Sequence, residues 1–234
     1  MLNDFRNVRA AVLCSKRAPG LDYVLQFPSR GAMFDVACVI TTEDEFPDRG
    51  IIQSQGVPVM THALRTFHVD RGMPIRDRAV RADYDAITAG VLRKLHIDVV
   101  VCLGYVFVLT EPMLTSFANR IFNIHDSDLS LVNHAGRRRY TGLHSTRDAI
   151  LAGENETRST LHVVTRELDA GPVVSRSESF PVAPLVNDAL AFGALDILRA
   201  YSYAHREWMM CRAWGPMVVQ LLERVAAGIQ AVAV

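Results

Sequence analysis

The segment DVVVCLGYVFVLTEPMLTSFANRIFNIH, residues 98–125, decides how the chain folds. Residues 98–103 form an apolar run with the length of a buried strand, and residues 120–125 form the next predicted strand. Residues 110–116, which lie between them, have the pattern of a short helix. Strand, helix and strand in this order are typical of two parallel strands joined by a crossover helix.

The same alternation continues on both sides of this segment. The pattern predicts further strands at 8–13, 34–40, 57–60, 159–165 and 172–180, and helices at 50–55, 77–95 and 145–151. The last two strands form a hairpin around residues 169–171. We expect a loop at 62–76 and helix from 184 to 227 with a break at Gly215-Pro216. An α/β fold with a largely parallel sheet follows, and such sheets bind ligands at the carboxyl ends of their strands.

Composition limits the classes of function. The 234 residues include 25 Lys+Arg and 25 Asp+Glu, so the formal net charge is zero. Neither a nucleic-acid partner nor an anionic membrane is expected from this balance. The longest apolar run, 99–109, is too short to span a bilayer, and residues 1–6 lack a signal pattern. The four scattered cysteines suit a reducing compartment. We therefore expect a cytoplasmic protein, with a main domain at 1–183 and a helical extension at 184–234 packed on it.

Asn123 and His125 are the first candidates for chemistry. The two-residue period of a strand places both side chains on one face, with Ile124 on the other. An amide donor and an imidazole on one face can hold a developing oxyanion, and an imidazole can carry a proton near neutral pH. The alternative interpretation is a strand end that carries ordinary polar residues.

Two later segments gain meaning only if the fold brings them to His125. An Asp before a Gly between two strands, as in Asp169-Ala170-Gly171, is most often a turn former. Gly142 would let the backbone approach a ligand, and Ser145 or Thr146 would cap the helix that follows. Each of these residues also has a purely structural explanation.

Taken together and in this order, these pieces resemble the folate-dependent formyltransferases. The motif is Asn-x-His at 123–125, Gly-Leu-His at 142–144 with Ala-Ile-x-x-Gly-Glu at 149–154, and Leu-His-x-Val-Thr-x-x-Leu-Asp-x-Gly-Pro at 161–172. The sequence looks most like the glycinamide ribonucleotide branch. The resemblance implies a Rossmann-like formyltransferase fold, with a mostly parallel central sheet flanked by helices and a helical C-terminal tail.

The resemblance also implies a reaction. A formyl group would pass from 10-formyltetrahydrofolate, the co-substrate, to an amine through a tetrahedral intermediate, without a metal. Asn123 would donate a hydrogen bond to the oxyanion, and His125 would stabilise the same charge. Asp169 would favour the protonated imidazole and order a water that carries the proton, and His162 matches a family histidine near the site. The pteridine would contact Gly104, Tyr105, Val108, Leu109, Leu114 and Thr165.

The loop after the first strand departs from the family. In the glycinamide ribonucleotide branch, backbone amides of a glycine-rich loop hold the phosphate. Residues 14–20 here read Cys-Ser-Lys-Arg-Ala-Pro-Gly, without a glycine pair. Lys16 and Arg17 would bind an anion through their side chains instead, which makes a different kind of site.

The loop after His125 is the second departure. Residues 125–130 read His-Asp-Ser-Asp-Leu-Ser, where the family usually has His-Pro-Ser-Leu-Leu-Pro, and the loop before Gly142 is longer. Asp126 follows the proposed catalytic histidine directly and is therefore a candidate to act on it. The alternative interpretation is an acidic loop residue in contact with solvent. Arg137, Arg138 and Arg139 would clamp a carboxylate or phosphate of the substrate, with Gly142 beside them. An exposed loop tip or an interface is the alternative for the three arginines.

We therefore expect an enzyme that formylates a small-molecule amine, with a homodimer left open. Three alternatives remain at this point. The first is phosphoribosylglycinamide formyltransferase of purine biosynthesis, and the second is a 10-formyltetrahydrofolate hydrolase that uses water as acceptor. The third is a folate- or nucleotide-binding module without catalysis.

Overall fold

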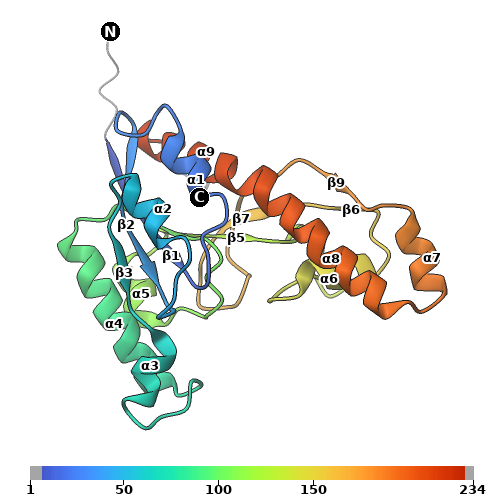
Figure 1. The fold of residues 1–234 in the computed structure, drawn as a ribbon, viewed down its shortest axis with the longest axis horizontal. Helices are drawn as coiled ribbons and strands as arrows, with labels where there is room; N and C mark the ends of the chain where they lie inside the picture. The colour runs from blue at the N-terminus through green and yellow to red at the C-terminus, as the bar shows by residue number, and fades with distance from the viewer. Residues whose placement is uncertain (1–6, 230–234) are drawn as a thin grey trace.

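A computed structural model describes residues 7–229, which build a seven-stranded sheet with helices on both faces (Figure 1). Its strands are β1 (Val8–Cys14), β2 (Phe34–Thr41), β3 (Val59–Thr61), β4 (Val99–Cys102), β5 (Ile121–His125), β7 (Thr160–Val163) and β8 (Val173–Arg176). Their order in the sheet is β3-β2-β1-β4-β5-β7-β8. The first five in this order are parallel, and the last two pairings are antiparallel. This confirms the expected Rossmann-like, mostly parallel sheet.

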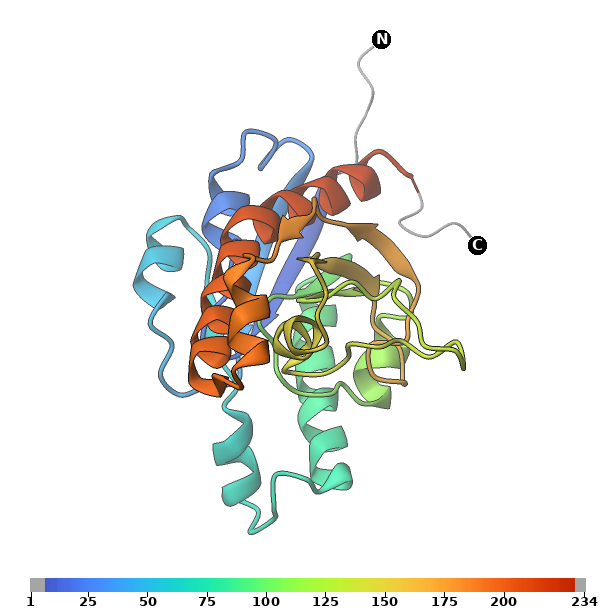
Figure 2. The same cartoon turned by 90° about the vertical axis from the view of Figure 1, so that its right-hand side faces the viewer.

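Helices cover the two faces of the sheet in separate layers (Figures 1 and 2). The first layer contains α1 (Leu21–Gln26), α2 (Arg49–Ser54) and α9 (Gly215–Ala226), and the second contains α4 (Arg78–Lys94) and α5 (Glu111–Ser116). Because side chains alternate along a strand, β1 serves both layers. Val12 and Cys14 are buried with the first layer, whereas Ala11 and Leu13 are buried with the second.

The remaining elements complete the described chain. They are α3 (Leu64–Val69), α6 (Ser145–Leu151), the short antiparallel pair β6 (Glu156–Thr157) and β9 (Phe180–Pro181), α7 (Leu185–Ala191), α8 (Leu195–Met209) and the π-helix η1 (Met210–Trp214). The predicted hairpin is confirmed, because β7 and β8 pair antiparallel around residues 164–172. Within residues 7–229, no helix has the length and apolar character to cross a membrane.

Three predictions about local structure are wrong. The strand predicted at 172–180 is divided into β8 and β9, which belong to different sheets, and residues 177–179 lie in neither strand. The segment 62–76 is not all loop, because residues 64–69 form α3, whose Leu64 and His68 are buried. The predicted helical break at Gly215-Pro216 lies instead at residues 192–194, between α7 and α8. Pro216 is the second residue of α9, whose first residue, Gly215, follows η1 directly. Proline is tolerated there because the first N–H groups of a helix have no partner within it.

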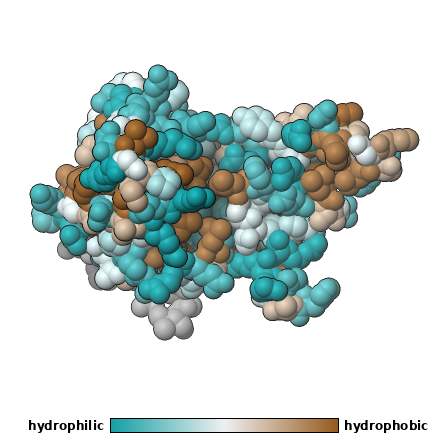
Figure 3. Space-filling view, turned by 90° about the horizontal axis from the view of Figure 1, so that it is seen from below, coloured by the Kyte–Doolittle hydropathy of each residue, from teal (hydrophilic) through white to brown (hydrophobic). Residues whose placement is uncertain are grey.

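The C-terminal helices complete the core of the sheet. Residues of η1 and α9 form one apolar cluster with β1, β2 and α1, in which Trp214 and Leu222 are fully buried. The division into a domain at 1–183 and an extension at 184–234 stays a prediction. The ends of these two segments, residues 1–6 and 230–234, lie outside the described residues. Exposed apolar side chains gather at the end of the molecule that carries α7, where Phe192 and Leu195 lie (Figure 3).

Candidate active site

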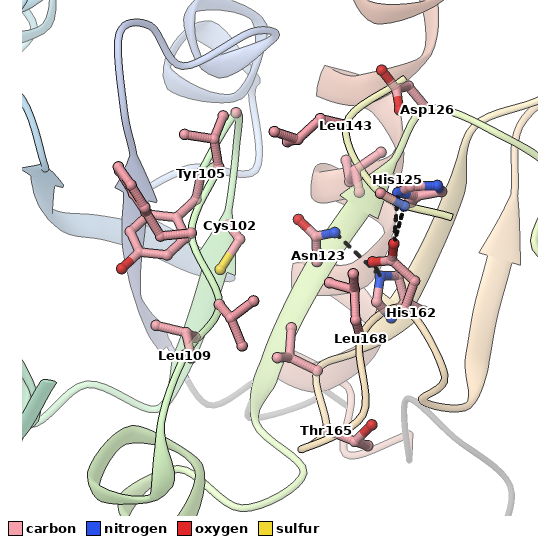
Figure 4. Close-up of a pocket in the computed structure, with 18 of the residues that line it drawn as sticks. Cys102, Tyr105, Leu109, Asn123, His125, Asp126, Leu143, His162, Thr165 and Leu168 are labelled. Atoms are coloured by element: carbon pink, nitrogen blue, oxygen red, sulfur yellow. Dashed lines mark hydrogen bonds and ion pairs between the residues drawn. The ribbon is translucent and has the colours of Figure 1, made fainter. Parts of the chain in front are cut away.

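A cavity of about 320 Å³ opens at the carboxyl ends of β4 and β5. This is the edge at which a parallel sheet is expected to bind ligands. The loop after β4 forms one wall, and β7 with the loop that follows it forms the other (Figure 4). The polar groups at one end of the cavity are Asn123, His125, Asp126, His162, Asp169 and Arg206.

His162 fixes the orientation of the Asn123 amide. The two residues are paired across β5 and β7, and the Asn123 Nδ2 atom lies 3.2 Å from His162 Nε2. His162 Nδ1 lies 3.0 Å from the carbonyl oxygen of Val163, so Nδ1 donates and Nε2 accepts. Burial lowers the pKa of His162 to about 4, which keeps this ring neutral at pH 7. One N–H of the Asn123 amide is thereby used, and the second remains for the cavity.

Asp169 lies between the two imidazole rings. One carboxylate oxygen is 3.6 Å from His125 Nδ1, and the other is 3.7 Å from His162 Nε2. The first oxygen also accepts a hydrogen bond of 2.8 Å from the N–H of Gly142. His125 Nε2 lies 3.1 Å from the carbonyl oxygen of Tyr140. Both ring nitrogens of His125 therefore face acceptor oxygens.

The backbone at Asp169 is held in an unusual conformation. Its φ is 51°, in the left-handed region that side chains other than Asn and Asp rarely adopt. The Arg138 guanidinium donates to the carbonyl oxygens of Asp169 and Gly171. A Cβ atom on Gly171 would lie 1.8 Å from the carbonyl oxygen of Val163, so only glycine fits this turn. These contacts fix where the Asp169 carboxylate points.

The walls of the cavity are apolar. Val106, Val108, Leu143 and Leu168 line it and expose about half or more of their side chains. Among residues 7–229, none hydrogen-bonds to the backbone N–H of Phe107, Val108 or Leu109. Apolar walls with free backbone donors fit an aromatic heterocycle that carries polar edges. The described chain contains no cluster of three or more His, Cys, Asp or Glu side chains that could hold a metal ion.

Below this loop, a buried ion pair supports Tyr105. The Arg81 guanidinium lies 2.5 Å from the Tyr105 hydroxyl and 3.0 Å from the Asp85 carboxylate. Asp85 also accepts hydrogen bonds from the N–H and the hydroxyl of Thr110, at 2.6 and 2.7 Å. Both ends of the loop after β4 are therefore tied to α4. This fixes the wall before any ligand binds.

Nine of the predicted site residues line the cavity: Asn123, His125, Asp169, Gly104, Tyr105, Val108, Leu109, Thr165 and Gly142. His162 lines it as well. Leu114 does not, because it packs on the apolar cluster between α4, α5 and the sheet. The period of the strand and the motif spacing thus indicated the polar end of the cavity and most of one wall.

The structure does not bring the predicted basic residues to the cavity. Arg17 pairs with Glu207 on α8, and Arg139 pairs with Glu154 at 2.7 Å. Arg138 holds the turn at Asp169. Lys16 and Arg137 are exposed and lie outside the cavity lining. In place of a clamp of three arginines, one guanidinium supports the active-site turn and a second ties the loop to Glu154, in the segment that follows α6.

Sequence reasoning missed Arg206 and Trp214, which approach the cavity from the C-terminal segment. Arg206 Nε donates to the carboxylate of Asp126, the residue after His125. Asp126 also accepts a hydrogen bond of 2.7 Å from Ser145. No motif or period connects residue 126 with residue 206, because the contact depends on how α8 crosses the sheet edge.

Comparison with known proteins agrees with this geometry. Residues 8–188 match the model of the formyl transferase family. The chain is 29% identical over 177 residues to phosphoribosylglycinamide formyltransferase of Haemophilus influenzae, which covers 75% of this chain and 74% of that protein. It is 25% identical over 169 residues to formyltetrahydrofolate deformylase of Bacillus subtilis, covering 72% of this chain and 49% of the relative.

A solved structure shares the fold. Glycinamide ribonucleotide transformylase 1 of Symbiobacterium toebii superposes with a TM-score of 0.63 and 25% sequence identity. The superposition covers 90% of this chain and 89% of that one. It therefore extends beyond residue 188, into the C-terminal helices that supply Arg206 and Trp214.

Proposed function

Because this chain belongs to the formyl transferase family and is a folate-dependent formyltransferase, we propose that it moves a formyl group from 10-formyltetrahydrofolate to an amine of a small molecule. The observation that carries the proposal is the meeting of Asn123, His125 and Asp169 at one end of a cavity with apolar walls. These side chains come from β5 and from the turn between β7 and β8, and they supply a hydrogen-bond donor, a proton carrier and a fixed negative charge.

The residues present fit the donor. The unpaired backbone N–H groups of Phe107–Leu109 would bind the edge of the pteridine, and Val106, Val108 and Leu168 would cover its faces. The bound donor supplies the activated formyl carbon. Its reacting end would then lie toward Asn123 and His125, because the polar groups of the cavity gather there.

Asn123 would stabilise charge in the transition state. As the acceptor nitrogen adds to the formyl carbon, the formyl oxygen becomes negative. The second N–H of the Asn123 amide, which His162 leaves free, is placed to donate to this oxygen. Fixed donors of this kind lower the barrier because they need no reorganisation during the reaction.

His125 and Asp169 would assist transfer of the proton that leaves the acceptor nitrogen. A new bond forms between the acceptor nitrogen and the formyl carbon, and the bond from this carbon to N10 of the folate breaks. The acceptor nitrogen loses a proton and N10 gains one, so the overall charge is unchanged. The Asp169 carboxylate, 3.6 Å from Nδ1, would stabilise the positive charge that the His125 ring acquires while the proton passes.

Glycinamide ribonucleotide is the second candidate acceptor, because the relative from Haemophilus influenzae bears the name of the enzyme that formylates it. Water is the third, because a formyltetrahydrofolate deformylase is also among the relatives. The same three side chains would serve each acceptor. The difference between these reactions lies in which nucleophile occupies the space beside His125.

The test is to incubate the protein with 10-formyltetrahydrofolate and one of three acceptors: a panel of small amines, glycinamide ribonucleotide or water alone. Formamide products and formate are then quantified separately. We expect a formylated amine to form in step with loss of the donor. Formate as the sole product with every acceptor would favour the hydrolase instead. Tight folate binding without any turnover would contradict both enzymatic readings.

A further inference from the structure

Arg206 is held beside the proposed reaction centre with its terminal nitrogens unused. Its Nε atom donates to one oxygen of the Asp126 carboxylate, and the other oxygen accepts from Ser145 at 2.7 Å. Asp126 is only 5% exposed, so this anchor is buried. Among the residues that the structure describes, none accepts a hydrogen bond from Nη1 or Nη2 of Arg206. A guanidinium fixed in this way presents two parallel donors, which match the two oxygens of a carboxylate.

Arg206 is also the one Lys or Arg among the residues that line the cavity in the described chain. The acidic side chains of the lining are Asp126, Glu167 and Asp169. A negatively charged group on a ligand would be repelled by these carboxylates and attracted by the Arg206 guanidinium. The side chain of Arg206 is 31% exposed, so water only partly screens this attraction.

The position of Arg206 limits how far the anion lies from the reacting nitrogen. Arg206 and His125 line the same cavity of about 320 Å³, so one small ligand can contact both side chains. A phosphate separated from the amine by a sugar would need a cation further away. The candidates for that role do not line the cavity, because Arg17 is paired with Glu207 and Lys16 lies outside.

We propose that the formyl acceptor is a small amino acid-type amine, and that Arg206 binds its carboxylate. Asp126 acts as a positioning residue that holds Arg206 in place. The inference rests on the proposed transferase function and adds the class of acceptor. It leaves the roles of Asn123, His125 and Asp169 unchanged.

The test compares matched acceptors that differ in one charge. Protein amino acids and β-alanine are offered with 10-formyltetrahydrofolate, each beside its carboxamide. For wild type, kcat/KM should favour the acid over its amide by about 10- to 100-fold, as expected for a charge-assisted hydrogen bond. In Arg206→Gln this preference should fall to about one. The change should appear as a higher KM for the acid and not as a lower kcat. Arg199→Gln, at an exposed ion pair on the same helix, should keep the wild-type preference.

A second variant distinguishes the loss of carboxylate binding from a loss of folding. Arg206→Gln leaves the Asp126 carboxylate without its partner, whereas Asp126→Asn with Arg206→Gln removes both charges and keeps an acceptor for Ser145. The double variant should also show no preference for the acid. Equal rates for acid and amide in wild type, or a preference that survives in both variants, would overturn the inference.

Other outcomes separate this inference from the proposed function. Formylation of glycinamide ribonucleotide or of uncharged amines, with no product from any amino acid, would overturn the inference and leave the formyltransferase intact. Release of formate alone would also overturn the inference, and it would identify the reaction as hydrolysis of the donor. Absence of any donor consumption would overturn the proposed function, and this inference with it.

Discussion

Asp169 combines a charge, a hydrogen-bond acceptor and a left-handed backbone in one residue. Asparagine keeps two of these properties, because its side-chain oxygen can accept from Gly142 and it tolerates a positive φ. Asp169→Asn therefore removes the charge between the two imidazoles and little else. We expect kcat to fall by about 100-fold or more, in line with the loss of effective proton transfer. Urea unfolding should show a nearly unchanged free energy of unfolding. A variant with the kcat of wild type would contradict the role assigned to the charge.

His162 acts through Asn123 in this account. His162→Phe removes the atom that accepts from the Asn123 amide, so the amide is free to rotate. We expect kcat to fall roughly fivefold, the equivalent of one ordinary hydrogen bond. His162→Gln keeps an acceptor and should recover part of the loss. Steady-state kinetics with saturating donor measure both variants, and equal activity in the Phe and Gln variants would contradict a positioning role.

At the scale of elements, the contact between α1 and the C-terminal helices depends on two glycines. A Cβ atom on Gly20 would lie 2.5 Å from the backbone nitrogen of Gly215. Gly20→Ala should therefore destabilise the fold by more than the strain of its left-handed backbone alone. Gly56→Ala is the matched control, because Gly56 has a φ of 80° against 79° for Gly20 and nothing within 4 Å of its Cβ position. Urea unfolding measures the difference.

We expect Gly56→Ala to cost about 1 kcal/mol, the usual penalty for alanine at a position that suits glycine. Gly20→Ala should cost at least 1 kcal/mol more, because overpacking adds to the strain. Equal losses in the two variants would mean that α1 and α9 can separate without cost. In that case the C-terminal helices would not be fixed to the sheet as described.

Elements with a strong period were predictable, and those set by distant contacts were not. The alternation of Phe122, Asn123, Ile124 and His125 is enough to place Asn123 and His125 on one face. By contrast, α3 lies in a segment with Gly72 and Pro74 and has no clear apolar period, and it is held by burial of Leu64 and His68. The place of Arg206 depends on the path of α8 across the sheet edge, which no local pattern encodes.

At the scale of the whole molecule, buried histidines make stability depend on pH. Burial lowers the pKa of His62 and of His162 to about 4 each, and it lowers the pKa of His205 as well. In the unfolded chain these rings take up protons near pH 6.5. The unfolded state therefore binds more protons than the folded state between about pH 6.5 and pH 4. By linkage, the free energy of unfolding falls as the pH falls through this window.

Urea unfolding at pH 7.5 and pH 5 measures this effect. Each group contributes at most about 1.4 kcal/mol for each pH unit within its window. His62 stacks on Tyr84 with ring centroids 3.7 Å apart, so His62→Phe keeps an aromatic ring there while it removes the titration. The variant should lose less stability than wild type between the two pH values. A loss equal to that of wild type would show that His62 is not a source of the dependence.

The central claim is that the Asn123 end of the cavity transfers a formyl group. The most direct measurement is the single-turnover rate with an isotope-labelled formyl donor, in wild type, in Asn123→Ala and in Asn187→Ala, an exposed control on α7. The account predicts that label passes from the donor into a formylated amine in wild type and in the control. It predicts a rate about 100- to 1,000-fold lower in Asn123→Ala, which still binds folate. An unchanged rate in folded Asn123→Ala, or no loss of label from the donor in wild type, would contradict it.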